Sequence, residues 1–314
     1  MNGKKVLVTG GLGNVGSKIT DYLSRAGYEV FVLTRKEKNI IPNINYKTIE
    51  ADITNLLELE EKLDFEIDFC VHLASFNESF EREYAEKALK INTLGTRNIL
   101  EVCKMRSVSH FIYFSTFHVY GVANGIVDES WAPQPINDYA LTHLFAEYYI
   151  KQFGCSNVLP FTILRLTNSY GCPTFLNTNK WYLVLNDLTK SAFEHGKIFI
   201  NGNGQAKRDF IFMGDVALVV DKLLNTVPHN AVYNLSSGKT YTISEIADSI
   251  KEIYKEKYFK SIDIHKDETD ITEYKDLLVS NNKLKNVVQF EPRDRINAEV
   301  GKIFDLLEMK NDAF

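Results

Sequence analysis

Several features are scarce or absent in this sequence of 314 residues, and each absence excludes a class of protein. No long apolar run occurs, so the sequence predicts no membrane-spanning helix. Seven prolines are too few for a collagen-like or disordered chain. The four cysteines show no CxxC spacing and no cluster with histidine, so we expect reduced thiols and no metal site. A net charge of −5 gives no support for a nucleic acid as partner.

The composition that is present suits a globular enzyme. With 45% hydrophobic and 25% charged residues, the chain can bury a large core, and its length fits one large domain with a smaller lobe. Residues 1–5 run directly into the first apolar stretch. We therefore expect no signal peptide and a cytoplasmic protein.

The N-terminus predicts a strand, a tight turn and a helix in direct succession. Residues 4–9 are a short β-branched apolar run that leads into the glycine-rich segment 10–16. Val15, Ile19 and Leu23 then recur every fourth residue, as in an amphipathic helix. Glycines let the backbone approach a ligand closely, and the helix start offers N–H groups to a pyrophosphate. The segment therefore predicts dinucleotide contacts, with an ordinary turn as the alternative, at Gly10, Gly13, Asn14, Val15 and Gly16.

Strands and helices alternate through the first half of the chain, as a doubly wound parallel sheet requires. Further strands are predicted at 29–33, 46–50, 69–73, 110–115 and 161–165, with helices near 55–63, 81–104 and 138–153. Ligands of such sheets bind outside the carboxyl ends of the strands. We therefore predict an α/β, Rossmann-type doubly wound fold. Its dinucleotide-binding domain spans 1–170, with 210–235 returning to it, and a smaller C-terminal substrate lobe comprises 171–209 and 236–314.

The residues that follow the second, third and fourth strands are candidates for the cofactor site. Thr34-Arg35-Lys36 occupies the place where an acidic residue usually accepts from the adenosine ribose. Arg35 is suited to a 2′-phosphate, which slightly favours NADP over NAD, although a solvated basic turn is equally consistent. His72 is expected to be a packed strand residue. The remaining contacts are expected at the adenine edge and beneath the cofactor, namely Asp52, Ile53, Leu73 and Ala74.

Seven motifs in order resemble one family, the extended short-chain dehydrogenases of the NAD-dependent epimerase/dehydratase type, which act on nucleotide sugars. They are TGGLGNVG at 9–16, Asp52-Ile53, His72-Leu73-Ala74, NTLGTRN from Asn92, STFHVYG at 115–121, LRLTNSYG at 164–171 and GNGQAKRDFIFMGDV at 202–216. The resemblance implies a nicotinamide cofactor with Asn92 among its contacts, and a nucleotide sugar as substrate. It also implies a homodimer formed through the helices near 85–104 and 139–153.

One position departs from the family's pattern. The segment Tyr139-Ala-Leu-Thr-His143-Leu-Phe-Ala-Glu147 resembles YxxSKxxxE, but His143 replaces the lysine. The resemblance implies that Tyr139 is the catalytic acid/base, and that position 143 holds the nicotinamide ribose and lowers the pKa of the tyrosine. A largely neutral imidazole lends less positive charge, so we expect slow turnover or an alkaline-shifted pH profile. The alternative is a packed histidine in a protein that only binds cofactor and nucleotide.

The residues around Thr116 bear on the reaction. Its hydroxyl is suited to a sugar oxygen and to sharing a proton with a tyrosine. By resemblance, Asn168 and Arg208 contact the diphosphate of the substrate. The family's 4,6-dehydratases carry Asp-Glu after the threonine, whereas Phe117 and His118 stand here, which disfavours dehydration. His118 is either a base or sugar contact or faces away. Hydride transfer at C4 remains, as a 4-epimerase, a 4-dehydrogenase or a 4-keto reductase, with the nucleotide and sugar left open.

Overall fold

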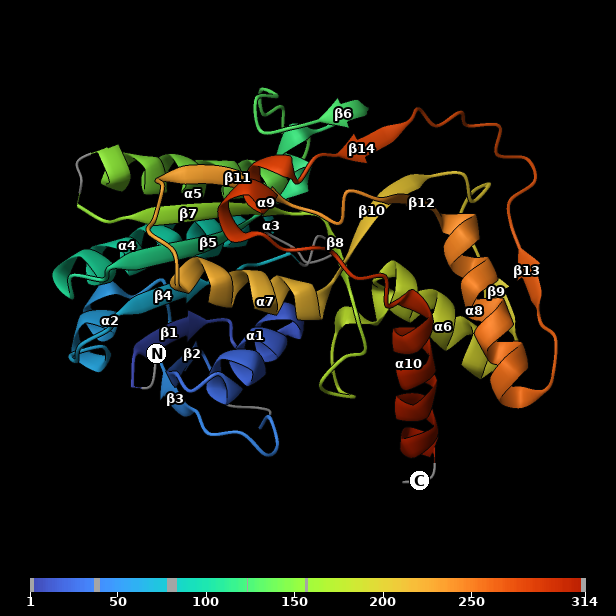
Figure 1. Ribbon diagram of the computed structural model, residues 1–314, viewed down its shortest axis with the longest axis horizontal. Helices are drawn as coiled ribbons and strands as arrows, with labels where there is room; N and C mark the ends of the chain where they lie inside the picture. The colour runs from blue at the N-terminus through green and yellow to red at the C-terminus, as the bar shows by residue number, and fades with distance from the viewer. Residues whose placement is uncertain (1–2, 37–39, 78–83, 123, 156–157, 312–314) are drawn as a thin grey trace.

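The protein is described by a computed structural model that covers residues 3–36, 40–77, 84–122, 124–155 and 158–311 (Figure 1). Its larger part is a seven-stranded parallel sheet in the order β11-β7-β5-β4-β1-β2-β3. The strands are β1 (Lys5–Thr9), β2 (Glu29–Thr34), β3 (Lys47–Glu50), β4 (Phe69–His72), β5 (His110–Thr116), β7 (Phe161–Leu166) and β11 (Ala231–Leu235). The predicted Rossmann-type sheet is confirmed, and six of its strands lie within two residues of their predicted bounds.

Helices cover both faces of this sheet, as its apolar strands require. One face packs against α1 (Asn14–Arg25), α7 (Met213–Leu224) and α9 (Asn282–Val288). The other face packs against α2 (Leu56–Lys62), α4 (Thr96–Met105) and α5 (Asp138–Cys155). A short helix α3 (Tyr84–Ala88) continues through a π-helical turn η1 (Leu89–Gly95) into α4. The predicted single helix near 81–104 is thus interrupted, and its residues 81–83 lie outside the described part of the chain.

A smaller lobe packs beside the carboxyl ends of the strands (Figure 1). Its helices are α6 (Val184–His195), α8 (Ile243–Tyr258) and α10 (Ile296–Asn311), and a 3-10 turn η3 (Lys180–Tyr182) precedes α6. Another 3-10 turn, η2 (Phe117–Tyr120), directly follows β5 and packs against α5. Short strands pair as β12 (Thr240–Thr242), β10 (Lys207–Phe212) and β8 (Asn168–Tyr170), as β13 (Asp263–His265) with β9 (Lys197–Phe199), and as β14 (Leu277–Val279) with β6 (Gly125–Val127). A capping box at Thr242 and Glu245 starts α8.

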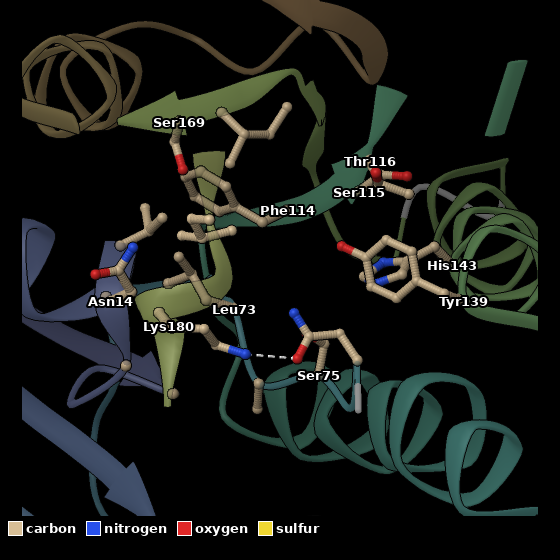
Figure 2. Close-up of a pocket in the computed structure, with 18 of the residues that line it drawn as sticks. Asn14, Leu73, Ser75, Phe114, Ser115, Thr116, Tyr139, His143, Ser169 and Lys180 are labelled. Carbon is tan, nitrogen blue, oxygen red and sulfur yellow. Dashed lines mark hydrogen bonds between the residues drawn. The ribbon is translucent and has the colours of Figure 1, made fainter. Parts of the chain in front are cut away.

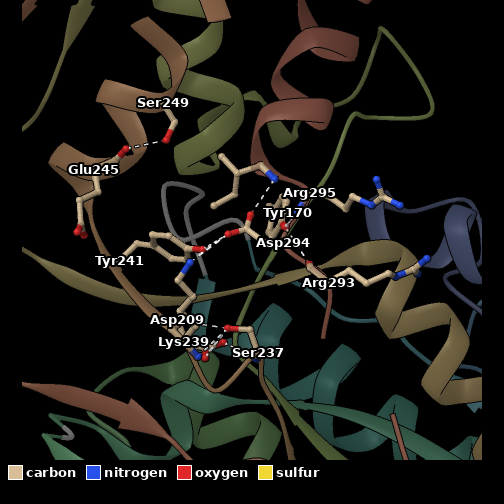
Figure 3. Close-up of polar contacts among 11 residues, drawn as sticks. Tyr170, Asp209, Ser237, Lys239, Tyr241, Glu245, Ser249, Arg293, Asp294 and Arg295 are labelled. Atoms are coloured by element: carbon tan, nitrogen blue, oxygen red, sulfur yellow. Dashed lines mark hydrogen bonds and ion pairs between the residues drawn. The ribbon is translucent and has the colours of Figure 1, made fainter. Parts of the chain in front are cut away.

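The lobe is tied to the large sheet by a buried carboxylate on β10 (Figure 3). Asp209 accepts hydrogen bonds from the Thr167 hydroxyl (2.6 Å), which follows β7, and from Ser237 and Gly238, which follow β11. Leu284 and Phe290 also pack in the core of the large sheet. The segment around α9 therefore belongs with the larger domain by packing, although the sequence-based division placed 236–314 in the lobe.

Candidate active site

A single cavity of about 1120 Å³ runs from the glycine-rich turn to the smaller lobe. Most residues predicted for cofactor and substrate line it: Gly10, Gly13, Asn14, Val15, Gly16, Arg35, Asp52, Ile53, Leu73, Ala74, Thr116, His118, Tyr139, His143 and Asn168. They come from the ends of five parallel strands and the helices that follow them. The cavity is therefore built at the carboxyl edge of the sheet, where such folds bind ligands.

The turn between β1 and α1 forms a backbone cradle at one end of the cavity. Gly10 has a φ of +68°, and a Cβ there would lie 2.9 Å from the backbone nitrogen of Ala74. A Cβ on Gly16 would lie 2.1 Å from the carbonyl oxygen of Gly10, so the turn admits no side chain at either position. Helix α1 begins at Asn14 without a side-chain cap, which leaves its first N–H groups to a ligand. The geometry fits the pyrophosphate of a dinucleotide.

At the adenosine end of the cavity, the predicted side chains are either exposed or bonded within the protein. Arg35 is exposed directly after β2. Asp52 uses its Oδ1 atom in a local turn, where it accepts from the backbone nitrogen and the hydroxyl of Thr54, both at 2.8 Å. The carbonyl oxygen of Ile53 accepts from Asn98 (3.0 Å), which fixes the loop after β3 against α4.

Two predicted site residues do not line the cavity. Asn92 is buried, and its amide bonds both backbone groups of Phe76 (2.6 and 3.0 Å) and the hydroxyl of Thr142 (3.0 Å). Its side chain is thus used to hold the loop after β4 against α5. Arg208 is exposed, and its Nη1 donates to the carbonyl of Lys207 (2.9 Å) rather than to its neighbour Asp209.

Tyr139 and Thr116 lie close together in the wall of the cavity (Figure 2). Tyr139 is the second residue of α5, and Thr116 is the last residue of β5. Burial raises the pKa of Tyr139 to about 12, and the hydrogen bond of the Thr116 hydroxyl opposes part of this rise. The Thr116 hydroxyl also accepts from the backbone nitrogen of His118 (3.2 Å). At neutral pH Tyr139 is therefore a protonated phenol, and the neighbouring Thr116 hydroxyl favours its ionised form.

His143 lies one helical turn after Tyr139, and its ring meets the Tyr139 ring with centroids 4.6 Å apart (Figure 2). Its Nδ1 shares a hydrogen bond of 2.7 Å with the hydroxyl of Tyr113 on β5. Its Nε2 is buried and has no hydrogen-bond partner among the described residues. Burial lowers the pKa of His143 to about 4, so position 143 carries no positive charge at neutral pH.

A buried ion pair fixes α5 against the sheet below these residues. Arg165 on β7 donates two hydrogen bonds to Glu147 (3.0 and 2.8 Å), and Ser115 donates a third (2.7 Å). Both charged side chains are nearly inaccessible to solvent, and Arg165 also stacks on the Tyr120 ring at 4.7 Å. The sequence contained both residues in its motifs without indicating that they pair, because the pairing joins elements that are not neighbours in the chain.

The sequence did not indicate that Lys180 enters the cavity from the smaller lobe. Lys180 donates from its Nζ to Asn77 (2.7 Å), which follows β4, and to the hydroxyl of Tyr182 (3.0 Å) (Figure 2). The contact bridges the two walls of the cavity. Lys180-Trp181-Tyr182 was noticeable in the sequence only as an aromatic cluster, which is more often part of a core.

The described residues contain no helix long and apolar enough to cross a membrane. Nor do they bring three histidine, cysteine or acidic side chains together as metal ligands.

Comparisons with known proteins agree with this geometry. The sequence is 32% identical over 254 residues to a putative UDP-glucose 4-epimerase of Methanocaldococcus jannaschii, which covers 78% of this chain and 81% of that protein. It is 29% identical over 286 residues to dTDP-D-glucose 4,6-dehydratase of Dictyostelium discoideum, with 80% of this chain and 61% of that protein covered. Its fold resembles that of a mutant UDP-glucuronic acid 4-epimerase from Bacillus cereus, solved with NAD and a substrate analogue. The TM-score is 0.82 at 23% identity, over 98% of this chain and 99% of that chain.

A further match covers most of the chain, from β1 through α5 and β10 to β11. Residues 6–236 match the family described as "NAD dependent epimerase/dehydratase family". The chain therefore belongs to the NAD-dependent epimerase/dehydratase family of nucleotide-sugar enzymes.

Proposed function

We propose that the protein transfers a hydride between a nicotinamide cofactor and C4 of a nucleotide sugar, as a 4-epimerase or a 4-dehydrogenase. The observation that carries this proposal is the meeting of Tyr139 and Thr116 in a cavity that also contains the glycine cradle. In its ionised form, Tyr139 can take the proton of a sugar hydroxyl while the hydride leaves the same carbon for the nicotinamide, with the Thr116 hydroxyl beside it. Tyr139 is assigned as acid/base and Thr116 as its assistant and sugar contact.

Other members of the family remove water from the sugar, but the residues after Thr116 argue against that reaction here. Dehydration needs an acid and a base at neighbouring carbons. Phe117 has no ionisable group and packs in a small apolar cluster with Val119 and Tyr120. Burial lowers the pKa of His118, so at neutral pH its imidazole is mainly unprotonated and a poor general acid. Hydride transfer without elimination is the simpler use of this site.

The cofactor we infer is NAD or NADP, held by the cradle of Gly10, Gly13 and Gly16 with Asp52 at the adenine. Bound there, it supplies the hydride acceptor and donor. The exposed Arg35 favours NADP, whereas the solved relative described above was in complex with NAD. Titration of both cofactors into wild type and Arg35→Ala separates the two: only NADP binding should weaken in the variant.

On the substrate side, Asn168 lines the cavity and Arg208 lies on the same small sheet, close enough for its charge to lower the pKa of His118. We assign both to the diphosphate, with Arg208 turning inward on binding, since no carboxylate among the described residues pairs with it. Lys180 adds a second cation at the cavity wall.

The experiment is conversion of GDP-, UDP- and dTDP-sugars by wild type, Tyr139→Phe and Tyr120→Phe. Tyr120 is as buried as Tyr113 but lies outside the cavity, so its variant controls for the loss of a buried hydroxyl. We expect loss of turnover only in Tyr139→Phe. A wild type that binds cofactor and nucleotide sugar yet converts none of them would support the alternative, an impaired binding protein. The replaced lysine and the raised pKa of Tyr139 favour that alternative.

We also propose a homodimer. Large apolar side chains are exposed on η1, α4 and α5, the elements expected to form it: Leu89, Leu94, Met105, Phe145 and Tyr148. Such a grouping on a water-soluble surface indicates a protein contact. Light scattering after gel filtration should give twice the chain mass, and Phe145→Glu should reduce it to that of a monomer.

A further inference from the structure

The hydrogen bond between Tyr113 and His143 determines which ring nitrogen of His143 carries the proton. A neutral imidazole nitrogen accepts a hydrogen bond better than a phenol oxygen does. The Tyr113 hydroxyl is therefore the donor to Nδ1, at 2.7 Å, and the ring proton of His143 lies on Nε2.

The surroundings of His143 keep this ring neutral. Its titratable neighbours are Tyr113 on β5, His72 on β4, His118 on η2, and Tyr139 and Glu147 on α5. Glu147 alone among them would favour a cation, and its carboxylate is already bonded twice by Arg165 and once by Ser115. Burial lowers the pKa of His72 to about 3, so this ring is also neutral, and its nitrogens share hydrogen bonds with the hydroxyls of Thr9 (2.6 Å) and Thr96 (2.9 Å).

The Nε2–H group of His143 is then a buried donor without an acceptor among the described residues. His143 is only 2% exposed, and Nε2 carries a proton that no described residue accepts. A buried donor without an acceptor is destabilising, and such groups in native proteins usually await a ligand or water. His143 lines the cavity, where its ring packs against that of Tyr139 (Figure 2). An acceptor oxygen that enters the cavity would satisfy it.

We propose that Tyr113 is a positioning residue that holds His143 as a neutral donor, whose Nε2–H binds a hydroxyl oxygen of the nucleotide cofactor. The proposal rests on the proposed function for the identity of the ligand. Position 143 thus offers the ligand one directed hydrogen bond without charge. Position 143 therefore supplies no positive charge to the cofactor. Tyr113 on β5 contributes to cofactor binding through His143, although it does not itself line the cavity.

The tautomer is tested first, in ligand-free protein labelled with ¹⁵N-histidine, with His143→Gln identifying the resonances of position 143. We expect the Nε2–H tautomer, unchanged between pH 6 and pH 9, and a shift of these resonances when NADH is added. Tyr113→Phe should give a mixture of tautomers, whereas the equally buried Tyr120→Phe should leave the spectrum unchanged. A proton on Nδ1, or a cationic ring at pH 7, would overturn the proposal.

Cofactor affinity is tested by titrating NADH and NADPH into the same variants. Loss of one aligned neutral hydrogen bond should weaken binding of the preferred cofactor by about three- to tenfold in Tyr113→Phe. Affinity equal to that of wild type and of Tyr120→Phe would refute a positioning role. If wild type binds neither cofactor, the proposed function fails together with the ligand assignment, while the tautomer measurement still decides whether Tyr113 orients His143.

Discussion

Substituting lysine for His143 reverses the one departure of this site from its family and has a calculable effect on Tyr139. The imidazole is neutral at pH 7 because burial lowers its pKa to about 4, so wild type provides no positive charge beside the phenol. Burial raises the pKa of Tyr139 to about 12. A lysine ammonium at position 143 would stabilise the phenolate, because an opposite charge nearby favours the ionised form of an acid.

The size of this effect follows from the ring geometry. The two rings are 4.6 Å apart, so an ammonium at the end of a longer stem would lie about 6 Å from the phenol oxygen. At an effective dielectric constant of about 20, this gives roughly 2.8 kcal/mol, or about two units of pKa. Tyr139 borders a cavity that admits water, which screens the pair, so we expect about one unit. One unit increases the available phenolate about tenfold.

The assay is turnover against pH for wild type, His143→Lys and His143→Gln, with the nucleotide sugar that wild type converts fastest. Wild-type turnover should rise with pH through the range from 7 to about 10, because the reactive phenolate is scarce below its pKa. The His143→Lys profile should shift by about one unit toward acid, whereas neutral His143→Gln should not shift. Coincident profiles for wild type and His143→Lys, or an equal shift in His143→Gln, would show that charge at position 143 does not control Tyr139.

Three further outcomes follow from the same geometry. Glu147→Gln should lower the free energy of unfolding by about 3–5 kcal/mol, measured in urea, because Arg165 is left buried without its carboxylate. Gly16→Ala should abolish cofactor binding in a titration, since its Cβ would lie 2.1 Å from a backbone oxygen. His72 and His143 have folded pKa values of about 3 and 4, below the unfolded 6.5, so the stability they contribute is present above pH 6.5 and lost below it. Between pH 6.5 and 5 each should remove about 2 kcal/mol in urea titrations, and an unchanged midpoint would contradict this.

The fold could be predicted because its signals are local. Apolar strands, the turn at Gly10 and the spacing of Val15 and Leu23 each depend on residues close in sequence, and ordered motifs joined them into one topology. β11 was not predicted, because its five residues are a short run interrupted by Asn234, and this edge strand is recognisable mainly through its pairing with β7.

The site could be predicted only in part, because several of its contacts join distant segments. Tyr139 and Thr116 follow from motifs, and the structure brings them together in one cavity. Asn92 belongs to a motif too, yet its amide is used by the backbone of Phe76, a contact across 16 residues that no spacing rule indicates. Lys180 reaches the cavity only through the placement of the lobe against the sheet.

The substitution at position 143 is accompanied by a complete set of supporting contacts, and this bears on how the site works. A site that has merely lost a lysine would leave a void or a disordered side chain where the ammonium had been. Here the imidazole is packed against Tyr139, bonded by Tyr113 and buried with a single donor unsatisfied. A packed ring with one unpaired donor facing a ligand cavity is a binding arrangement, whatever its rate consequence. We therefore expect cofactor affinity to depend on His143 through its hydrogen bond, and turnover to depend on it through the charge it fails to supply.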